Sequence, residues 1–486
     1  MDPAEFRTHG HALVEWVAAY LTGSERYPVL PRVAPGDLTR SLPASAPEHG
    51  EPFEQIFADF ERLIVPALTH WNHPGFFAYF AITGSAPGVL AEFLAAALNQ
   101  QAMLWQTSPA ATELEDVSLS WLRELLGLPP AFEGVIYDTA SISTVHALAT
   151  ARDEAMAGAS QYGLAGRREV NPGRVFCSEH AHSSVEKAAR LLGLGREAVC
   201  RIPIDDQFQM RPETLRDALD ADRDRGITPV AVVATLGTTS TTSVDPVGPI
   251  AALCRARGIW LHVDAAYAGA AAMLPEYRPL FAGWEDADSI VVNPHKWLFV
   301  PFDLSAFYCR RMDAVRRSFA LVPEYLEARP ASGAAKNLMD TGVQLGRRFR
   351  ALKLWFILRH LGAERIRAAL TEHIRLARLF ASWVDATPAF ERLAPVPFSV
   401  VCFRARPSGV APEALNQFNE RLLDTVNADG DVFLSHTRVG DAFAIRLAVG
   451  HLRTRETHVA RAWELLTAHA ADLSRKRLSP PGATRW

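Results

Sequence analysis

A lysine and an aspartate that each follow a short apolar run are the residues in this chain best suited to chemistry. Lys296 comes four residues after the run 289–292, and Asp264 directly follows the run 259–263. Both runs are short and rich in β-branched residues, which predicts buried strands. A lysine amine can condense with an aldehyde, and a carboxylate can hold a protonated ring nitrogen. The pair is therefore typical of an enzyme that uses pyridoxal 5′-phosphate (PLP).

Lys296 alone does not establish such a site. A lysine at a strand end often extends its ammonium group into solvent, and this ordinary explanation stays open for the residue taken by itself. Asp264 favours the catalytic interpretation, because ligands of open α/β sheets bind beyond the carboxyl ends of strands, where both residues are expected.

Two hydroxyl-rich stretches also follow predicted strands. Residues 138–144 precede a predicted helix and include Ala140 and Ser141, while residues 236–242 include Thr239. Free N–H groups and the dipole at a helix start attract a phosphate, and hydroxyl groups add donors. A simple Ser/Thr helix cap is the alternative explanation for each stretch.

His180 and His182 flank an alanine just after the predicted strand 175–177. One histidine in such a place is usually structural, but two of them beside a candidate lysine and carboxylate favour a functional role. No Cys or Glu stands at metal-ligand spacing, so no metal site is predicted.

Composition limits the partners of the protein. The 486 residues are 49% hydrophobic and 21% charged, with a formal net charge of −4, and this gives no reason to expect nucleic acid or an anionic membrane. The five cysteines are scattered and form no C-x-x-C pair, which fits a reducing cytoplasm. We also expect no signal peptide and no membrane span.

The pattern of predicted elements indicates three parts. Residues 1–85 are predicted to form a helical dimerisation segment, since their two apolar helix stripes need another surface to pack against. Strands and helices alternate over residues 86–350, which predicts an α/β domain with a mostly parallel sheet and helices on both faces. Residues 351–486 are predicted to form a small α+β domain. The strands expected in the large domain are 135–137, 175–177, 230–234, 259–263, 290–292 and 304–308, and those in the small domain are 399–403 and 442–447.

Four ordered motifs resemble those of the group II PLP-dependent decarboxylases, with the aromatic-L-amino-acid decarboxylases as the nearest branch. They are NPHKW at 293–297, HVDAAYAG at 262–269, AHSSVEK at 181–187 and LGRRFR at 345–350. Residues 69–71 and 76–80 also match, so the resemblance covers nearly the whole chain. It implies fold type I of the PLP-dependent transferases (aspartate-aminotransferase-like), a homodimer, PLP as cofactor, and decarboxylation of aromatic L-amino acids such as tryptophan, 5-hydroxytryptophan, DOPA, tyrosine or phenylalanine.

The resemblance also implies roles for individual residues. Lys296 would form the Schiff base with PLP, Asp264 would pair with the pyridine nitrogen, and His182 would stack on the ring. Tyr325 would be the tyrosine of a mobile loop and the proton donor to the substrate carbon. The other implied cofactor contacts are Ala140, Ser141 and Asn293 at the phosphate, and Thr239, Ala266 and His295 along the cofactor. The implied substrate contacts are Trp71, Tyr79, Phe80, Ala81, Ile82, Gln101, Met103 and Gly346.

Three points stay open from the sequence. Asp138 stands where a small residue is usual, and a carboxylate beside a phosphate is repulsive unless it points away or is protonated. Gln101 offers an amide for either an indole N–H group or a phenol. Decarboxylation of glutamate or histidine, oxidative deamination to an aldehyde, and a non-catalytic binding role are the alternative functions.

Overall fold

The computed structural model describes residues 1–321 and 336–478. The chain divides into two compact units. The larger unit comprises Ile82–Arg375 and Ala394–Val400, and the smaller one comprises Met1–Ala81, Leu376–Leu393 and Val401–Trp486. The division into three domains at residues 85 and 350 stays a prediction.

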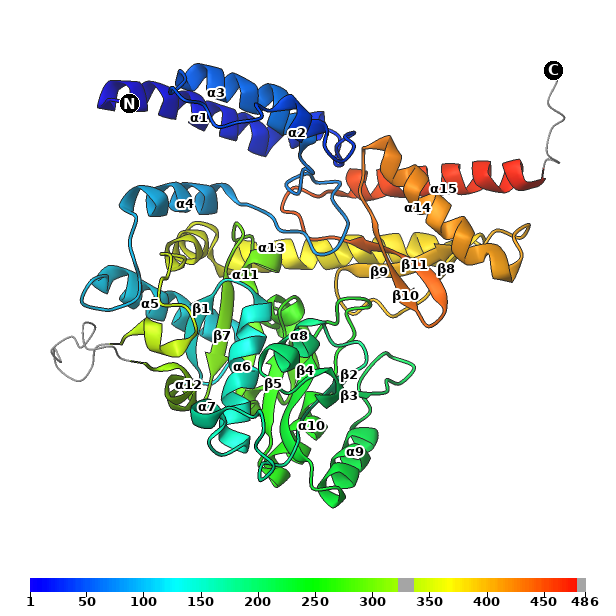
Figure 1. The fold of residues 1–486 in the computed structure, drawn as a ribbon. Coiled ribbons are helices and arrows are strands. Elements are labelled where there is room, and N and C mark those ends of the chain that lie inside the picture. The colour runs from blue at the N-terminus through cyan, green and yellow to red at the C-terminus, as the bar shows by residue number, and fades with distance from the viewer. Residues whose placement is uncertain (322–335, 479–486) are drawn as a thin grey trace. The chain divides into compact units, whose positions relative to one another are not determined.

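A seven-stranded sheet forms the centre of the larger unit (Figure 1), with the order β1-β7-β6-β5-β4-β2-β3. The pairs β6–β5, β5–β4, β4–β2 and β2–β3 are parallel, whereas β7 runs antiparallel to β1 and β6. The strand bounds are β1 Glu133–Tyr137, β2 Gly173–Ser178, β3 Val199–Ile202, β4 Thr228–Thr235, β5 Trp260–Asp264, β6 Ser289–Val292 and β7 Ser305–Cys309. The predicted mostly parallel sheet is confirmed, and β3, an edge strand with one buried residue, is the strand of this sheet that the sequence did not reveal.

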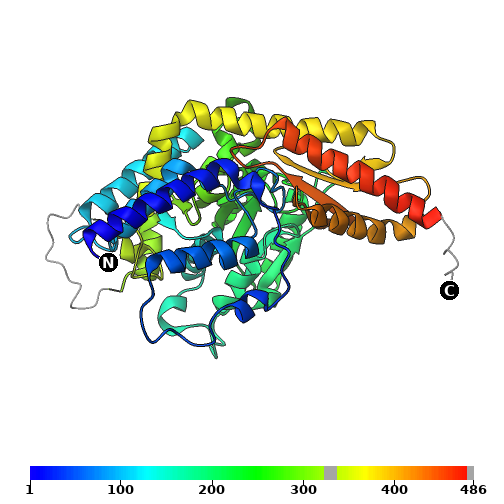
Figure 2. The same cartoon turned by 90° about the horizontal axis from the view of Figure 1, so that it is seen from above.

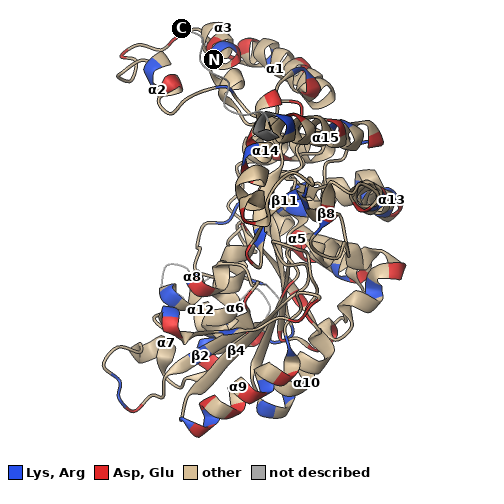
Figure 3. Cartoon of the chain, turned by 90° about the vertical axis from the view of Figure 1, so that its right-hand side faces the viewer, with Lys and Arg blue, Asp and Glu red and all other residues tan. Residues whose placement is uncertain are grey.

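Helices cover both faces of this sheet, as Figure 3 shows from the side. Helix α6 (Ala140–Ala155) packs on β4, β5 and β6, and α8 (Ser184–Leu191) and α12 (Met312–Phe319) pack against α6. On the opposite face, α10 (Val247–Arg257) contacts β4 and β5, and α9 (Pro212–Asp224) contacts β4. Strand β4 is buried from Val230 to Thr235 because side chains on both of its faces meet helices.

The buried residues of a covering helix show which of its sides packs on the sheet. In α10 the residues at helical spacing Val247, Ile250, Ala251 and Cys254 are buried, so one stripe faces the sheet. Acidic and basic residues are frequent along α9 and α10, as the red and blue segments of the ribbon in Figure 3 show. The other helices of this unit are α4 Ala86–Leu98, α5 Pro109–Leu126, α7 Ala159–Tyr162 and α11 Pro294–Trp297.

The smaller unit begins with two helices that pack on each other. In α1 (Pro3–Gly23), the Asp2 carboxylate accepts from the N–H groups of Ala4 and Glu5, and the Glu5 carboxylate accepts from the Asp2 N–H group, which forms a capping box. The ring of Trp16 contacts Phe57 of α3 (Phe53–Asp59) at a centroid distance of 6.4 Å. No residue of α1 or α3 is fully buried, so this pair of helices leaves apolar side chains exposed.

A four-stranded sheet in the order β10-β11-β9-β8 completes the smaller unit. Its strands are β8 Phe390–Arg392, β9 Val400–Ala405, β10 Ser435–Val439 and β11 Ala442–Ala448. Helix α14 (Leu415–Asp429) packs on β11 and beside α15 (Glu456–Leu478), as Figure 2 shows. The predicted strands 399–403 and 442–447 correspond to β9 and β11. The short helix α2 is Asp37–Ser41, and the long α13 spans Ala351–Ala386 with a break at Gly362.

Within the described ranges, the structure holds no helix that is long and apolar enough to cross a membrane.

Candidate functional site

Strands β4, β5 and β6 end at the same edge of the sheet, and the candidate residues follow them there. Asp264 is the last residue of β5, and Lys296 lies in the short helix α11 after β6. Asp264 and Val291 of β6 are register partners, so these two strand ends lie next to each other. The structure therefore brings the two residues to one edge of the sheet, as expected for parallel strands.

The Asp264 side chain is buried and held in place. Its Oδ1 atom accepts a hydrogen bond from the Ala266 N–H group at 3.0 Å, and only 8% of the residue is exposed. Thr235 of β4 is its register partner on the neighbouring strand, and the Thr235 hydroxyl is buried without a hydrogen-bond partner. A buried carboxylate beside an unused hydroxyl is a polar pair that is ready to receive a ligand.

Helix α11 fixes the position of Lys296 through its two neighbours. The fully buried Trp297 donates its indole N–H to His373 Nδ1 at 3.0 Å, and His295 Nδ1 accepts from the Leu304 N–H group at 2.9 Å. Burial lowers the pKa of Lys296, and the negative charge of Asp264 partly opposes this effect. A lowered pKa leaves more of the amine unprotonated, which is the form that attacks an aldehyde.

Two buried serines connect Asn293 to the start of α6. The Ser305 hydroxyl donates to Asn293 Oδ1 at 2.7 Å, and it also lies 2.9 Å from the Ser143 hydroxyl in α6. Asn293 Nδ2 lies 3.3 Å from His295 Nε2. This chain of contacts links the segment after β6 to the helix that carries Ala140 and Ser141.

The first turn of α6 leaves N–H groups available for an anion. Ala140 and Ser141 begin the helix, and the side chain of Thr139 at the N-cap makes no capping hydrogen bond. The Thr139 hydroxyl donates instead to Asp138 Oδ1 at 3.1 Å. The Asp138 carboxylate also accepts from Thr139 N–H and from the Gln344 side chain, so both of its oxygens are engaged.

These residues fit PLP as a ligand. A lysine of lowered pKa suits the aldehyde, a buried carboxylate suits the ring nitrogen, and an uncapped helix start suits the phosphate. The unused Thr235 hydroxyl adds an orphaned buried polar atom next to Asp264.

His182 lies in the loop between β2 and α8, and its charge environment connects it to the same edge of the sheet. Partial burial of the ring lowers its pKa, the negative charge of Asp264 acts against this shift, and the positive charge of Lys296 adds to it. His182 Nδ1 accepts from the Ser184 N–H group at 3.1 Å, so the neutral ring carries its proton on Nε2.

The remaining candidate cofactor residues differ in their surroundings. Ala266 is buried directly after Asp264, whereas Thr239 is exposed in the turn that follows β4. In that turn the buried Thr238 hydroxyl lies 2.8 Å from the Ser243 hydroxyl and gives the turn its internal hydrogen bond. Tyr325 lies outside the described residues.

The candidate substrate residues of the smaller unit form an aromatic surface. The rings of Trp71 and Tyr79 stack at 5.9 Å with an interplanar angle of 21°, and both side chains are exposed. Phe80 is 8% exposed, and the guanidinium of Arg446 lies over its ring at 5.3 Å. Ala81 follows it and is buried.

In the larger unit, Gln101 and Gly346 lie against each other. Gln101 Oε1 accepts from the Arg347 N–H group at 2.7 Å, and Gln101 Nε2 lies 3.2 Å from the place where a Cβ atom on Gly346 would be. The half-buried Met103 accepts from the Met339 N–H group through its carbonyl at 3.1 Å. Ile82 is also half-buried in this unit.

Sequence reasoning missed the residues that hold the site together. Ser305 stands inside the predicted strand 304–308 and Thr235 directly follows the predicted strand 230–234, while Ser143 lies in the hydroxyl-rich stretch 138–144, where nothing distinguishes it from its neighbours. The buried ion pair of Arg347 with Glu115, at 2.8 Å, was missed for the same reason.

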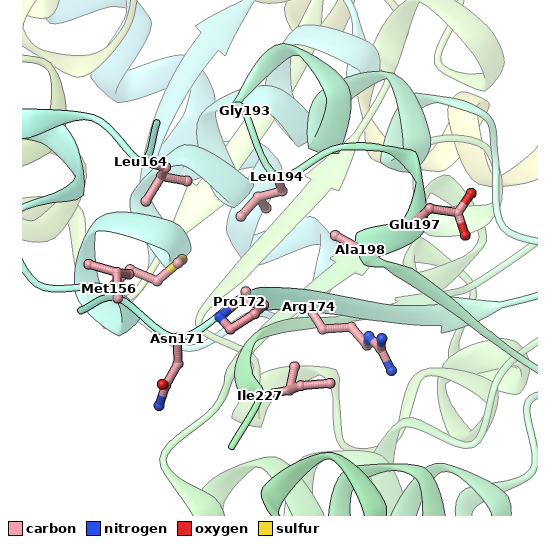
Figure 4. Close-up of a pocket in the computed structure, with 12 residues that line it drawn as sticks. Met156, Leu164, Asn171, Pro172, Arg174, Gly193, Leu194, Glu197, Ala198 and Ile227 are labelled. Atoms are coloured by element: carbon pink, nitrogen blue, oxygen red, sulfur yellow. The ribbon is translucent and has the colours of Figure 1, made fainter. Parts of the chain in front are cut away.

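A separate pocket of about 300 Å³ lies at the opposite edge of the sheet, where β2 begins (Figure 4). Met156, Leu164, Leu194 and Ile227 give it an apolar wall, and Arg174 on its rim forms an ion pair with Asp222. None of the candidate site residues that the structure describes lines it.

Comparison with known proteins gives a consistent result. Residues 35–406 match the family described as "Pyridoxal-dependent decarboxylase conserved domain". The chain is 40% identical to the aromatic-L-amino-acid decarboxylase of Mus musculus, over 98% of each chain, and 38% identical to the phenylacetaldehyde synthase of Arabidopsis thaliana, also over 98% of each. The crystal structure of Oryza sativa TDC with PLP and tryptamine superposes with a TM-score of 0.94, at 36% identity, over 98% of this chain and 99% of that one. The predicted α/β fold of type I is thereby confirmed.

Buried neutral histidines predict that acid destabilises the fold. Burial lowers the pKa of His262 from 6.5 to about 4, so the unfolded chain takes up the proton first as the pH falls. Above pH 6.5 the His262 ring is neutral in both the folded and the unfolded chain, and the free energy of unfolding has its full value. Between pH 6.5 and pH 4 the unfolded chain binds the proton more readily, and the free energy of unfolding falls by an amount on the order of 2 to 3 kcal/mol. Urea unfolding at pH 7 and pH 4.5 should therefore show a smaller pH difference for His262→Gln than for the wild type. His360→Gln, at an exposed position, is the control, and an unchanged difference in His262→Gln would contradict the prediction.

Proposed function

This chain belongs to the pyridoxal-dependent decarboxylase family, and we propose that it converts aromatic L-amino acids to the corresponding amines and CO₂. It is a carboxy-lyase whose cofactor is PLP. PLP, when bound, supplies the electron sink that lets the bond between Cα and the carboxylate break. The observation that carries the aromatic assignment is the exposed stacked pair Trp71 and Tyr79, in a chain 40% identical to an aromatic-L-amino-acid decarboxylase.

The residues at the edge of the sheet would hold the cofactor from three sides. Lys296 would bind its aldehyde carbon, and Asp264, oriented by the Ala266 N–H group, would hold the proton of the ring nitrogen. The N–H groups of Ala140 and Ser141, with the Ser141 hydroxyl and Asn293, would receive the phosphate. His295 stays neutral because burial lowers its pKa to about 3, so it adds no charge beside Lys296.

His182 is suited to move a proton in this site. Its Nδ1 atom is occupied by the Ser184 N–H group, so Nε2 carries the proton that the ring can donate. Tyr325 is the proposed donor to the substrate carbon, with His182 assisting it. A site that excludes water favours loss of the carboxylate as neutral CO₂.

Formation of an aldehyde is the second candidate function. The 38% identity to a phenylacetaldehyde synthase favours it specifically, since that relative is named for an aldehyde product. Both functions use the same cofactor and aromatic substrates. Identification of the products separates them: the first function gives an amine and CO₂, whereas the second consumes O₂ and gives an aldehyde, CO₂, ammonia and hydrogen peroxide. Glutamate and histidine are proposed to be poor substrates, because the exposed rings of Trp71 and Tyr79 offer an aromatic wall to the side chain.

Gln101 is proposed to act as a hydrogen-bond donor to the substrate ring. Its oxygen accepts from the Arg347 N–H group, which leaves the Nε2 donor beside Gly346. A donor suits a ring hydroxyl oxygen, whereas an indole N–H group would need an acceptor. We therefore propose a preference for hydroxylated aromatic rings, in a pocket that the absent side chain of Gly346 leaves wide.

A homodimer and a cytoplasmic location complete the proposal. Helix α4 presents Leu90, Phe93, Leu94 and Leu98 along one stripe, each at least 42% exposed. Helices α1 and α3 also leave apolar residues exposed, including Phe6 and Ile56. Such surfaces need a partner, and a second copy of the chain is the one proposed. The five cysteines are free, which fits a reducing compartment.

The assignment of Lys296 is tested by chemical labelling. Borohydride reduction of the PLP-loaded protein, followed by peptide mapping, should place the label on Lys296. Lys296→Ala should lose at least a thousandfold in kcat and should lack the absorbance band of the lysine-bound cofactor. A label on any other lysine would show the assignment to be wrong.

The donor role of Gln101 is tested by substrate pairs. The wild type should favour 5-hydroxytryptophan over tryptophan and tyrosine over phenylalanine in kcat/KM. Gln101→Met keeps the length of the side chain and removes its donor, so both ratios should fall, on the order of fivefold to tenfold. Gln100→Met is the control at the neighbouring exposed position. Equal ratios in Gln101→Met and the wild type would exclude the donor role, and a preference for glutamate or histidine would exclude the aromatic pocket.

Self-association is tested at the α4 stripe. Phe93→Glu places a charge in the apolar surface and should weaken the dimer at least tenfold, as measured by sedimentation. Leu191→Glu, at an exposed apolar residue of α8, should leave the oligomeric state unchanged. A wild-type protein that is monomeric at micromolar concentration would disprove the proposal.

A further inference from the structure

Three residues, one each from β1, the loop that follows it and α6, hold the segment 341–344 by hydrogen bonds. The Tyr137 hydroxyl donates to the Thr341 carbonyl. His146 Nε2 accepts from the Val343 N–H group at 3.1 Å, and Asp138 Oδ2 accepts from Gln344 Nε2 at 3.1 Å. We call Tyr137, Asp138 and His146, together with residues 341–344, the clasp.

The residues of the clasp are closely packed against one another. A Cβ atom on Gly342 would lie 2.9 Å from His146 Cε1 and 3.2 Å from Tyr137 Cε1, so only a glycine fits between these rings. The rings of Tyr137 and His146 contact each other at 4.2 Å. The backbone of the segment therefore lies directly on the two side chains.

One buried nitrogen atom of the clasp has no hydrogen-bond partner, and this lowers the stability of the fold. His146 is 1% exposed, and its Nδ1 atom has no hydrogen-bond partner. Since Nε2 accepts from Val343, the neutral ring must carry its proton on this orphaned Nδ1 atom. A buried donor without an acceptor is destabilising, so the bond to Val343 is kept against a penalty.

The two segments that the clasp joins continue along the chain into different parts of the proposed site. Asp138 directly precedes Thr139, Ala140 and Ser141, where the cofactor phosphate is proposed to bind. Gln344 precedes Gly346 by two residues. The next residue, Arg347, donates its N–H to Gln101 and its guanidinium to the carbonyl of Ile136, at 2.7 Å in both cases. The clasp thus joins the phosphate loop to the segment proposed to contact the substrate ring.

We propose that Tyr137, Asp138 and His146 are positioning residues that couple the phosphate site to the substrate-side segment 341–346. The inference rests on the proposed function, since it assumes that PLP and an aromatic amino acid occupy these two places. A loosened clasp should weaken the binding of both, because each then has to order its own segment.

The hydrogen bonds of the clasp explain how the Asp138 carboxylate is tolerated beside an anion site. One of its oxygens accepts from Thr139 and the other from Gln344, so the charge is held by the clasp. It still adds negative charge near the phosphate. Removal of the charge without loss of the clasp should therefore tighten PLP binding.

The test uses variants that separate the hydrogen bonds from the charge. His146→Phe removes the acceptor for Val343, whereas His146→Gln retains an acceptor at the position of Nε2. Gln344→Met removes the donor to Asp138, and Gln100→Met is its matched control at an exposed glutamine outside the site. Asp138→Asn removes the charge, and an amide can still pair with Gln344 after rotation of the glutamine amide.

Two readouts are measured for each variant. The first is the Kd for PLP, from spectroscopic titration of the apoprotein, and the second is KM and kcat for amine formation from an aromatic amino acid. His146→Phe and Gln344→Met should raise both the Kd and the KM, by threefold to tenfold, with a smaller change in kcat. His146→Gln should restore values near the wild type. Asp138→Asn should lower the Kd for PLP by at least threefold and leave KM unchanged.

Wild-type Kd and KM in both His146→Phe and Gln344→Met would overturn the proposal. Equal defects in His146→Phe and His146→Gln would also overturn it, since the acceptor would then be irrelevant. Failure of the proposed function looks different: no aromatic amino acid would give an amine, while the PLP titrations would still report on the clasp.

Discussion

The buried ion pair between Arg347 and Glu115 is the interaction on which the substrate-side part of the larger unit depends. Glu115 is 2% exposed and also accepts from the Ile136 N–H group, and Arg347 donates to the Ile136 carbonyl. A buried charge is tolerated only when it is paired and fully hydrogen-bonded. Because these two charges must meet, helix α5, the end of β1 and the segment around residue 346 are fixed relative to one another within this unit.

The cost of a buried unpaired charge also determines the protonation of residues at the edge of the sheet where Asp264 and Lys296 lie. Burial keeps His262 and His295 neutral and lowers the pKa of Lys296. A site built in this way carries few unpaired charges, so each polar group acts strongly on a bound ligand. The carboxylate of Asp264 and the first turn of α6 are then suited to the two charged ends of PLP.

The clasp shows how unusual residues can compensate one another. Asp138 is the position where the sequence departs from the family that it resembles, and by itself it suggests a repulsive phosphate loop. In the fold the carboxylate is engaged by Thr139 and by Gln344, a residue 206 positions away. His146 and Gly342 fit each other in the same contact. The effect of a residue that differs from the family pattern can therefore be judged only together with the distant residues that contact it in the fold.

The sequence by itself determined the α/β class, the strand that ends at Asp264, the strand that Lys296 follows, and the family, because these depend on local patterns and ordered motifs. Strand periodicity is a property of neighbouring residues, so β4 to β7 could be predicted from their runs. The edge strand β3, the Ser143–Ser305–Asn293 chain, the hydrogen bond between Gln101 and Arg347, and the Arg347–Glu115 pair were decided only by the tertiary structure. Their physical reason is the same in each case: a hydrogen bond or an ion pair forms between residues distant in sequence, and no local pattern encodes which of them will meet.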